Sequence, residues 1–93
     1  MLEDIAADIR KGLNGKSFDG SLKFDCGDDG VVILDNGDVK TADQDTDCTL
    51  RLSTENLKKL LRGQLNPMTA VMMGKIKISG EMGVAMKLGK LIG

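Results

Sequence analysis

Three aspartates at alternate positions, Asp43, Asp45 and Asp47, have the spacing of the first, third and fifth ligands of an EF-hand calcium loop. The rest of that loop does not follow. Cys48 stands at the sixth position, where the loop needs glycine, and Thr54 stands at the twelfth, where it needs a bidentate glutamate. The segment is therefore predicted to be a solvated loop between strands, and no metal site is expected.

Other catalytic groups are sparse. The sequence has no histidine, which is the commonest general base and the commonest zinc ligand. Cys26 and Cys48 cannot close a tetrahedral zinc site alone, and both fall in alternating apolar patterns that predict small buried side chains. GKS at 15–17 resembles the end of a phosphate-binding loop, but Arg10 stands where its first glycine belongs. Serine, threonine and lysine remain as nucleophiles without a marked base, so we do not expect an enzyme.

Methionine is the residue type that clusters most clearly. Five of the six methionines fall within nineteen consecutive residues: Met68, Met72, Met73, Met82 and Met86. Methionine is unbranched and polarizable, so it suits surfaces that bind apolar partners of variable shape. The alternative is a core in which methionines fill irregular gaps. The cluster therefore indicates either an apolar binding surface or an adaptable core.

The last predicted helix, which begins after Gly80, is apolar around most of its circumference. Its apolar positions sweep roughly 220°, whereas a helix that lies on a sheet needs a stripe of about 100°. Gly83, Lys87 and Lys90 form the remaining polar edge. The surplus apolar surface must therefore meet another helix, another subunit or a ligand.

Hydropathy periodicity predicts the elements that carry these residues. Helical spacing over 2–13 predicts a one-sided helix, and alternation over 21–26 predicts a strand with one wet face. The continuous apolar run 31–34 is typical of a strand covered on both faces, and DNGD at 35–38 is typical of a hairpin. The remaining elements are a strand from Val39, a strand over 48–52, a helix capped by Ser53 or Thr54, a short helix from Pro67, a strand around Ile76 and Ile78, and the final helix. This order predicts an α+β fold with a mainly antiparallel sheet covered by helices.

Composition limits the class of protein. Ninety-three residues predict a single domain over 1–93, and a formal charge of -1 with two aromatic residues disfavours binding to nucleic acid. The acidic start MLEDIAADIR is unlike a signal peptide, and the apolar runs are far shorter than the ~20 residues of a spanning helix. We therefore expect a soluble, cytoplasmic protein.

Residues 48–91 resemble the carboxy-terminal half of the sterol carrier protein type two family. The shared features are a threonine-rich strand that runs into a capped Leu-rich helix, Gly-x-Leu-x-Pro-Met-x-Ala at 63–70, Gly-Lys-hydrophobic-Lys-hydrophobic at 74–78 and Gly-x-Met-x-x-Ala-Met-Lys-Leu at 80–88. The first half is similar to the family in order and spacing, without a motif that would prove membership alone.

The resemblance implies a five-stranded sheet, helices over one face, and an apolar tunnel between them for sterols, fatty acids, fatty acyl-CoAs or phospholipids. It implies no metal and no cofactor. The chain ends Leu91, Ile92, Gly93, unlike the peroxisomal tripeptide of many eukaryotic members, and lacks the extension that closes the tunnel in longer members. We therefore do not expect peroxisomal import, and we expect an open groove for an acyl chain in preference to a sterol site.

These expectations combine into an intracellular lipid-binding and transfer domain that contacts membranes transiently. The residues predicted to line the tunnel are Leu50, Met68, Val71, Met72, Ile76, Ile78, Met82, Ala85, Met86 and Leu91. Lys87 and Lys90 are candidates for contact with a lipid headgroup, with a solvated face as the alternative. The rival hypothesis is a non-enzymatic interaction domain whose apolar final helix forms a homodimer or docks on a lipid-metabolising enzyme.

Overall fold

The computed structural model describes the backbone of residues 2–13 and 20–92 and the side chains of residues 2–11 and 20–87. The helices are α1 (Leu2–Leu13), α2 (Thr54–Leu61), α3 (Pro67–Met72) and α4 (Met82–Ile92), with a short 3-10 helix η1 (Gly27–Asp29). The strands are β1 (Ser21–Asp25), β2 (Val31–Asp35), β3 (Asp38–Lys40), β4 (Cys48–Arg51) and β5 (Lys77–Gly80). The predicted elements are present in the predicted order.

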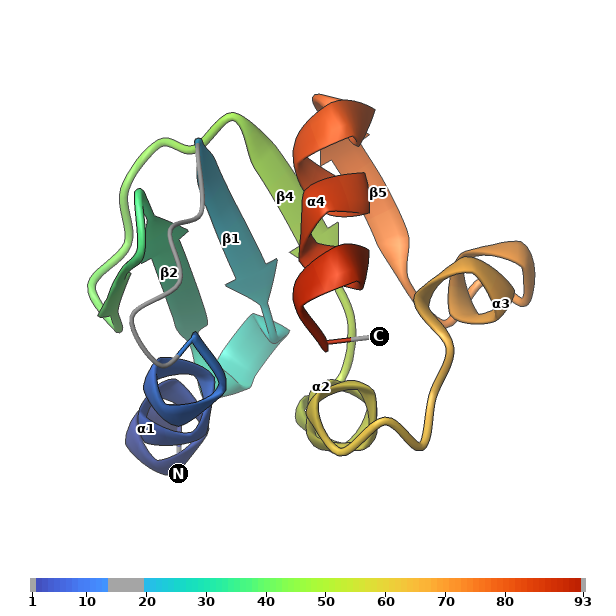
Figure 1. Ribbon diagram of the computed structural model, residues 1–93, viewed down its shortest axis with the longest axis horizontal. Coiled ribbons are helices and arrows are strands. Elements are labelled where there is room, and N and C mark those ends of the chain that lie inside the picture. Colours follow the sequence, from blue (N-terminus) through green and yellow to red (C-terminus); the bar gives the residue numbers. More distant parts are fainter. Residues whose placement is uncertain (1, 14–19, 93) are drawn as a thin grey trace.

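The five strands form one sheet in the order β3-β2-β1-β4-β5. Three of the four pairings are antiparallel, and β1 pairs with β4 in parallel, with Leu22 opposite Cys48 and Phe24 opposite Leu50. The parallel pair arises because the segment 41–47 returns the chain across the sheet before β4 begins (Figure 1). The prediction of a mainly antiparallel α+β fold is confirmed, with the correction that the sheet is mixed.

The core lies on one face of the sheet, between the strands and the helices α1, α2 and α4 (Figure 1). Leu22 and Phe24 of β1 are fully buried there, and the helices contribute Ile5, Leu57 and Val84 to the same cluster. Alternate residues of each strand point to this face because successive side chains of a strand point to opposite sides of the sheet. Helices over one face are therefore confirmed.

The opposite face of β2 is also covered. Ile33 is fully buried on that face, opposite Lys23 of β1 and Lys40 of β3. The Lys23 ammonium forms an ion pair with Asp43 at 2.7 Å, and Gln44 donates a hydrogen bond to Asp35 at 3.1 Å. These contacts fasten the segment 41–47 to this face, so the strand is buried on both sides, as its continuous apolar run predicted.

Polar side chains set the beginnings of α2 and α3. The Ser53 hydroxyl accepts a hydrogen bond from the backbone N–H of Asn56, so Ser53 is the cap of α2. The Asn66 side chain accepts from the backbone N–H groups of Met68 and Thr69, and Pro67 occupies the first turn of α3. Both caps fix where the following apolar residues point.

Candidate functional site

The predicted lining residues fall into three groups by burial. Leu50 and Ile76 belong to the core, with exposed fractions of 4% and 2%. Partly buried side chains that pack against the core are Val71, Ile78 and Ala85. The four methionines of the prediction, Met68, Met72, Met82 and Met86, are all exposed. Leu91 lies beyond the side chains that the structure describes.

The methionines form an open surface. Their exposed fractions run from 52% for Met82 to 85% for Met72, and Met73 is exposed as well. Among the side chains that the structure describes, the exposed large apolar ones are these five methionines. They are therefore neither gap-filling core residues nor enclosed, and they present flexible apolar groups to the outside.

The orientation of α4 explains why its methionines are exposed. Val84 is buried, and its methyl group lies 3.4 Å from the position that a side chain at Gly20 would take. At about 100° per residue, Met82 and Met86 lie nearly opposite Val84 on the helix. Ala85, between these two sides, is partly buried against the core. One side of α4 thus anchors the helix, and the other displays methionine.

A tight turn fixes the start of α4 against β4. The backbone N–H of Glu81 donates to the carbonyl oxygen of Asp47 at 2.9 Å. Gly80 has a φ of +96°, and a Cβ at this position would overlap that same carbonyl oxygen. Glycine is therefore required both for the left-handed backbone and for the close approach. The turn places Met82 immediately after the edge strand β5.

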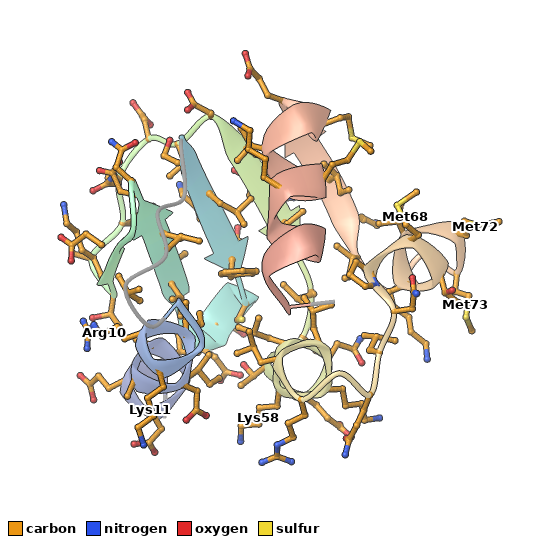
Figure 2. All side chains as sticks on the ribbon, viewed as in Figure 1. Arg10, Lys11, Lys58, Met68, Met72 and Met73 are labelled. Atoms are coloured by element: carbon orange, nitrogen blue, oxygen red, sulfur yellow. The ribbon has the colours of Figure 1, made fainter. Side chains whose placement is uncertain are left out.

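The short helix α3 is held by few residues and displays the others. Ala70 is fully buried, and its carbonyl oxygen accepts from the backbone N–H groups of Lys75 and Ile76. In the view of Figure 2, Met68 lies on the side of α3 nearer α4, whereas Met72 and Met73 project to the edge of the molecule. Met68 therefore differs from Met72 and Met73 in what it can contact.

Three exposed methionines and three partly buried apolar residues that pack against the core form a set that we call the apolar corner. Its members are Met68, Val71, Ile78, Met82, Ala85 and Met86. These residues come from α4 and β5, which lie side by side, and from α3, which lies beyond β5 at the edge of the molecule (Figure 1). Lys87 is exposed next to Met86 in the sequence, and the side chain of Lys90 lies outside the described residues. The corner offers an apolar contact surface with a cation beside it.

The two thiols are poor nucleophiles. Burial raises the pKa of Cys26, against a smaller lowering by a hydrogen bond with Thr54. Burial likewise raises the pKa of Cys48, against a smaller lowering by the backbone of Ala85. Both sulfurs are therefore protonated at neutral pH and shielded from solvent.

The described residues also bear on metals and membranes. No group of three or more His, Cys, Asp or Glu residues suited to a metal ion occurs within the described part of the chain. None of the described helices has the length and apolar character that crossing a membrane requires.

Charge is segregated along the chain, a feature that the small total conceals. Residues 1–55 contain thirteen of the fourteen acidic and six of the thirteen basic residues, a formal charge of -7. Residues 56–93 carry +6. The five exposed methionines all lie in the basic part. Counting charge by halves would have shown this from the sequence alone.

Comparison with known protein families gives a match over nearly the whole chain. A family model described as the SCP-2 sterol transfer family matches residues 2–93. The chain belongs to this family. The resemblance expected from residues 48–91 is thereby confirmed, and it extends over the amino-terminal half, for which the sequence offered no motif.

Relatives show how the domain occurs elsewhere. Sterol carrier protein 2 of Gallus gallus is 45% identical over 64 residues, which cover 66% of this chain and 12% of that protein. This chain thus corresponds to a small part of a much longer relative. The solution structure of sterol carrier protein domain 2 of Helicoverpa armigera aligns with a TM-score of 0.74 at 28% identity, covering 95% of this chain and 82% of that one. Palmitated SCP2L2 of Aedes aegypti aligns with a TM-score of 0.69 at 25% identity, covering 98% and 89%.

Proposed function

We propose that the domain binds and transfers a lipid whose acyl chain or ring system lies on the apolar corner. The ligand class comprises a fatty acid, a fatty acyl-CoA, a phospholipid or a sterol. The observation that carries the proposal is the exposure of Met68, Met82 and Met86 beside the partly buried Val71 and Ile78. Membership of a sterol transfer family and the palmitated state of the Aedes aegypti relative support it.

The corner suits a chain-like ligand of variable length. Each methylene that leaves water contributes ~0.8 kcal/mol, so about ten of them would contribute about 8 kcal/mol before ordering costs if fully covered. An open surface covers only part of each methylene, which lowers the affinity and eases release. Methionine side chains can repack around different chains, so similar affinity for several chain lengths follows.

The proposed role is that of a lipid carrier that catalyses no reaction. The thiols of Cys26 and Cys48 are buried with raised pKa values, which supports a role without thiol chemistry. Lys87, adjacent to Met86, is the nearest candidate in the sequence for contact with an anionic headgroup.

A second candidate function rests on the same exposure. Apolar side chains at the surface also favour a homodimer or docking on a lipid-metabolising enzyme. Native mass spectrometry of protein purified from cells separates the two candidates. A carrier retains lipid mass on the monomer, whereas an interaction domain shows oligomers without added lipid.

Titration with a fluorescent fatty acid in vesicle-free buffer tests the proposal. We expect a stoichiometry near one per chain for the wild type. Met86→Glu places a carboxylate on the corner and should weaken binding about tenfold or more. Met73→Glu is the matched control, because Met73 and Met86 are 62% and 61% exposed and Met73 lies outside the corner. Equal losses in both variants, or no binding by the wild type, would contradict the proposal.

A further inference from the structure

The two charge halves of the sequence remain two regions in the fold. In Figure 1, α1, β1, β2 and β3 lie at the left of the view, whereas α3 and β5 lie at the right, with α2 and α4 between. The first group belongs to residues 1–55, with a formal charge of -7, and α3, β5 and α4 belong to residues 56–93, with +6. The domain is therefore electrically polar although its total charge is near zero.

The two halves also differ in how many of their cations form ion pairs. In the acidic half, Lys23, Lys40 and Arg51 each pair with an aspartate of the same half. In the basic half, Lys59 pairs with Glu55 of the acidic half, one turn earlier in α2. Among the described residues, no ion pair engages four exposed cations of the basic half: Lys58, Arg62, Lys75 and Lys77. Their charge is directed outward.

Two of these cations follow closely in the sequence after Met72, the most exposed of the described methionines, and Met73. Met72, at 85% exposed, and Met73, at 62%, end α3 and are followed after Gly74 by Lys75. Ile76 is buried, so Lys75 and Lys77 on either side of it point outward and are exposed. We call Met72, Met73, Lys75 and Lys77 the α3 tip. It combines flexible apolar groups with two uncompensated positive charges.

We propose that the α3 tip docks the domain on an anionic lipid bilayer, with the methionines entering the headgroup boundary and the lysines contacting lipid phosphates. Apolar side chains beside lysines bind such a surface by burial and by attraction to anionic lipids together. The inference rests on the proposed function, because docking would bring the neighbouring apolar corner close to the membrane lipid that the domain binds.

An anionic bilayer matches the α3 tip better than a second copy of the chain does. A second copy could offer its acidic half to the lysines. However, the exposed large apolar side chains among the described residues all belong to the basic half, so the acidic half offers Met72 and Met73 no apolar counterpart. Charge also disfavours α1 as the docking element, because its three acidic residues outnumber Arg10 and Lys11.

Flotation with vesicles tests the proposal on the full chain. We expect partition into phosphatidylcholine vesicles with about 30% phosphatidylserine to exceed partition into pure phosphatidylcholine by about tenfold. Lys75→Glu should reduce it about fivefold or more, and Lys11→Glu, an exposed lysine of α1, should leave it within about twofold. Met72→Ser with Met73→Ser should also reduce it about fivefold. Salt near 1 M, where screening acts over about 3 Å, should abolish the preference for anionic vesicles.

Several outcomes would overturn the proposal. One is equal partition of the wild type into both vesicle types, and another is an equal loss of vesicle binding in Lys75→Glu and Lys11→Glu. A third is the absence of vesicle binding together with oligomers, seen by native mass spectrometry, that dissociate in Lys75→Glu. Titration with a fluorescent fatty acid without vesicles separates this inference from the proposed function. A Lys75→Glu variant with lost vesicle binding and unchanged fatty acid affinity supports docking at the α3 tip. Fatty acid binding without any vesicle binding sinks the docking inference alone.

Discussion

The acidic and basic halves of this domain differ in how far their side chains are buried and paired. In the acidic half, β2 is buried on both faces, its neighbouring lysines are paired, and Thr54 at the start of α2 donates a hydrogen bond to Asp29 at 2.6 Å. In the basic half, α3 and α4 hold the core with Ala70 and Val84 and leave their methionines exposed. The difference teaches that stability is concentrated in one half and available contact surface in the other.

The largest contrast is expected from truncating one large side chain in each half. Phe24→Ala removes a fully buried ring from β1 and should lower the free energy of unfolding by about 3–5 kcal/mol. Met72→Ala removes an 85% exposed side chain and should change it by no more than about 0.5 kcal/mol. Urea denaturation of both variants measures the difference. Similar losses would show that α3 is packed more tightly than its exposure indicates.

Substitutions at two glycines of the basic half distinguish the cost of a strained backbone from the cost of a steric overlap. Gly80 and Gly74 both have positive φ angles, but a Cβ at Gly80 would overlap the Asp47 carbonyl oxygen, whereas nothing lies within 4 Å of one at Gly74. Gly80→Ala should therefore lower the free energy of unfolding by about 3 kcal/mol. Gly74→Ala should lower it by about 1 kcal/mol, the cost of the backbone conformation alone.

Thermal or urea denaturation of both glycine variants provides the measurement. If Gly74→Ala destabilised the protein as much as Gly80→Ala, the turn at Asp47 would not be what holds the start of α4. The comparison thus tests the junction between β4 and the methionine-bearing helix.

The two thiols, which both lie in the acidic half, make the stability of the fold depend on pH. Burial raises the pKa values of Cys26 and Cys48 in the folded state, while an unfolded chain has thiols of ordinary pKa, about 8.5. The stability that follows is fully present below the unfolded pKa. It is lost as the pH rises above about 8.5, because the unfolded state then releases protons that the folded state retains.

We therefore expect the free energy of unfolding to fall between about pH 8.5 and 9.5, before lysines titrate. A Cys26→Ala and Cys48→Ala double variant, starting from a lower stability, should show a flatter dependence over that range. Denaturant melts at several pH values measure both. An equal slope in the double variant would mean that other groups control the alkaline range.

Met86→Trp, like Met72→Ala, is expected to have little effect on stability. The 61% exposed side chain leaves room for the larger ring, so the free energy of unfolding should change by no more than about 0.5 kcal/mol. If Met86 were packed core, overpacking would cost ~1–3 kcal/mol. The ring should also compete with a bound acyl chain for the apolar corner. A denaturant melt and a fatty acid titration on this variant measure the two effects separately.

Local sequence patterns predicted the elements well. Apolar periodicity and turn residues located each helix and strand, the cap of α3 at Asn66 followed from Pro67, and the continuous run through Ile33 indicated burial on both faces. The parallel pairing of β1 with β4 could not be predicted in this way. It joins residues such as Leu22 and Cys48, and periodicity within a strand does not specify its partner.

The candidate site was harder to predict for a related reason. A wide apolar arc on α4 shows that surplus apolar surface exists, but it does not show what covers that surface. The structure leaves Met82 and Met86 exposed and places Leu50 and Ile76, expected beside them, in the core. The charge asymmetry was available from the sequence, and only the use of the total charge concealed it.

The core of this domain is assembled without the methionines of the described region, since each of those is more than half exposed. Selection acting on the contact surface is therefore largely decoupled from selection acting on foldability. Substitutions at Met68, Met72, Met73, Met82 and Met86 can accumulate in a lineage, or be introduced in a combinatorial library, without exhausting the stability margin. A scaffold of this kind can acquire new ligand preferences by neutral drift at a handful of surface positions.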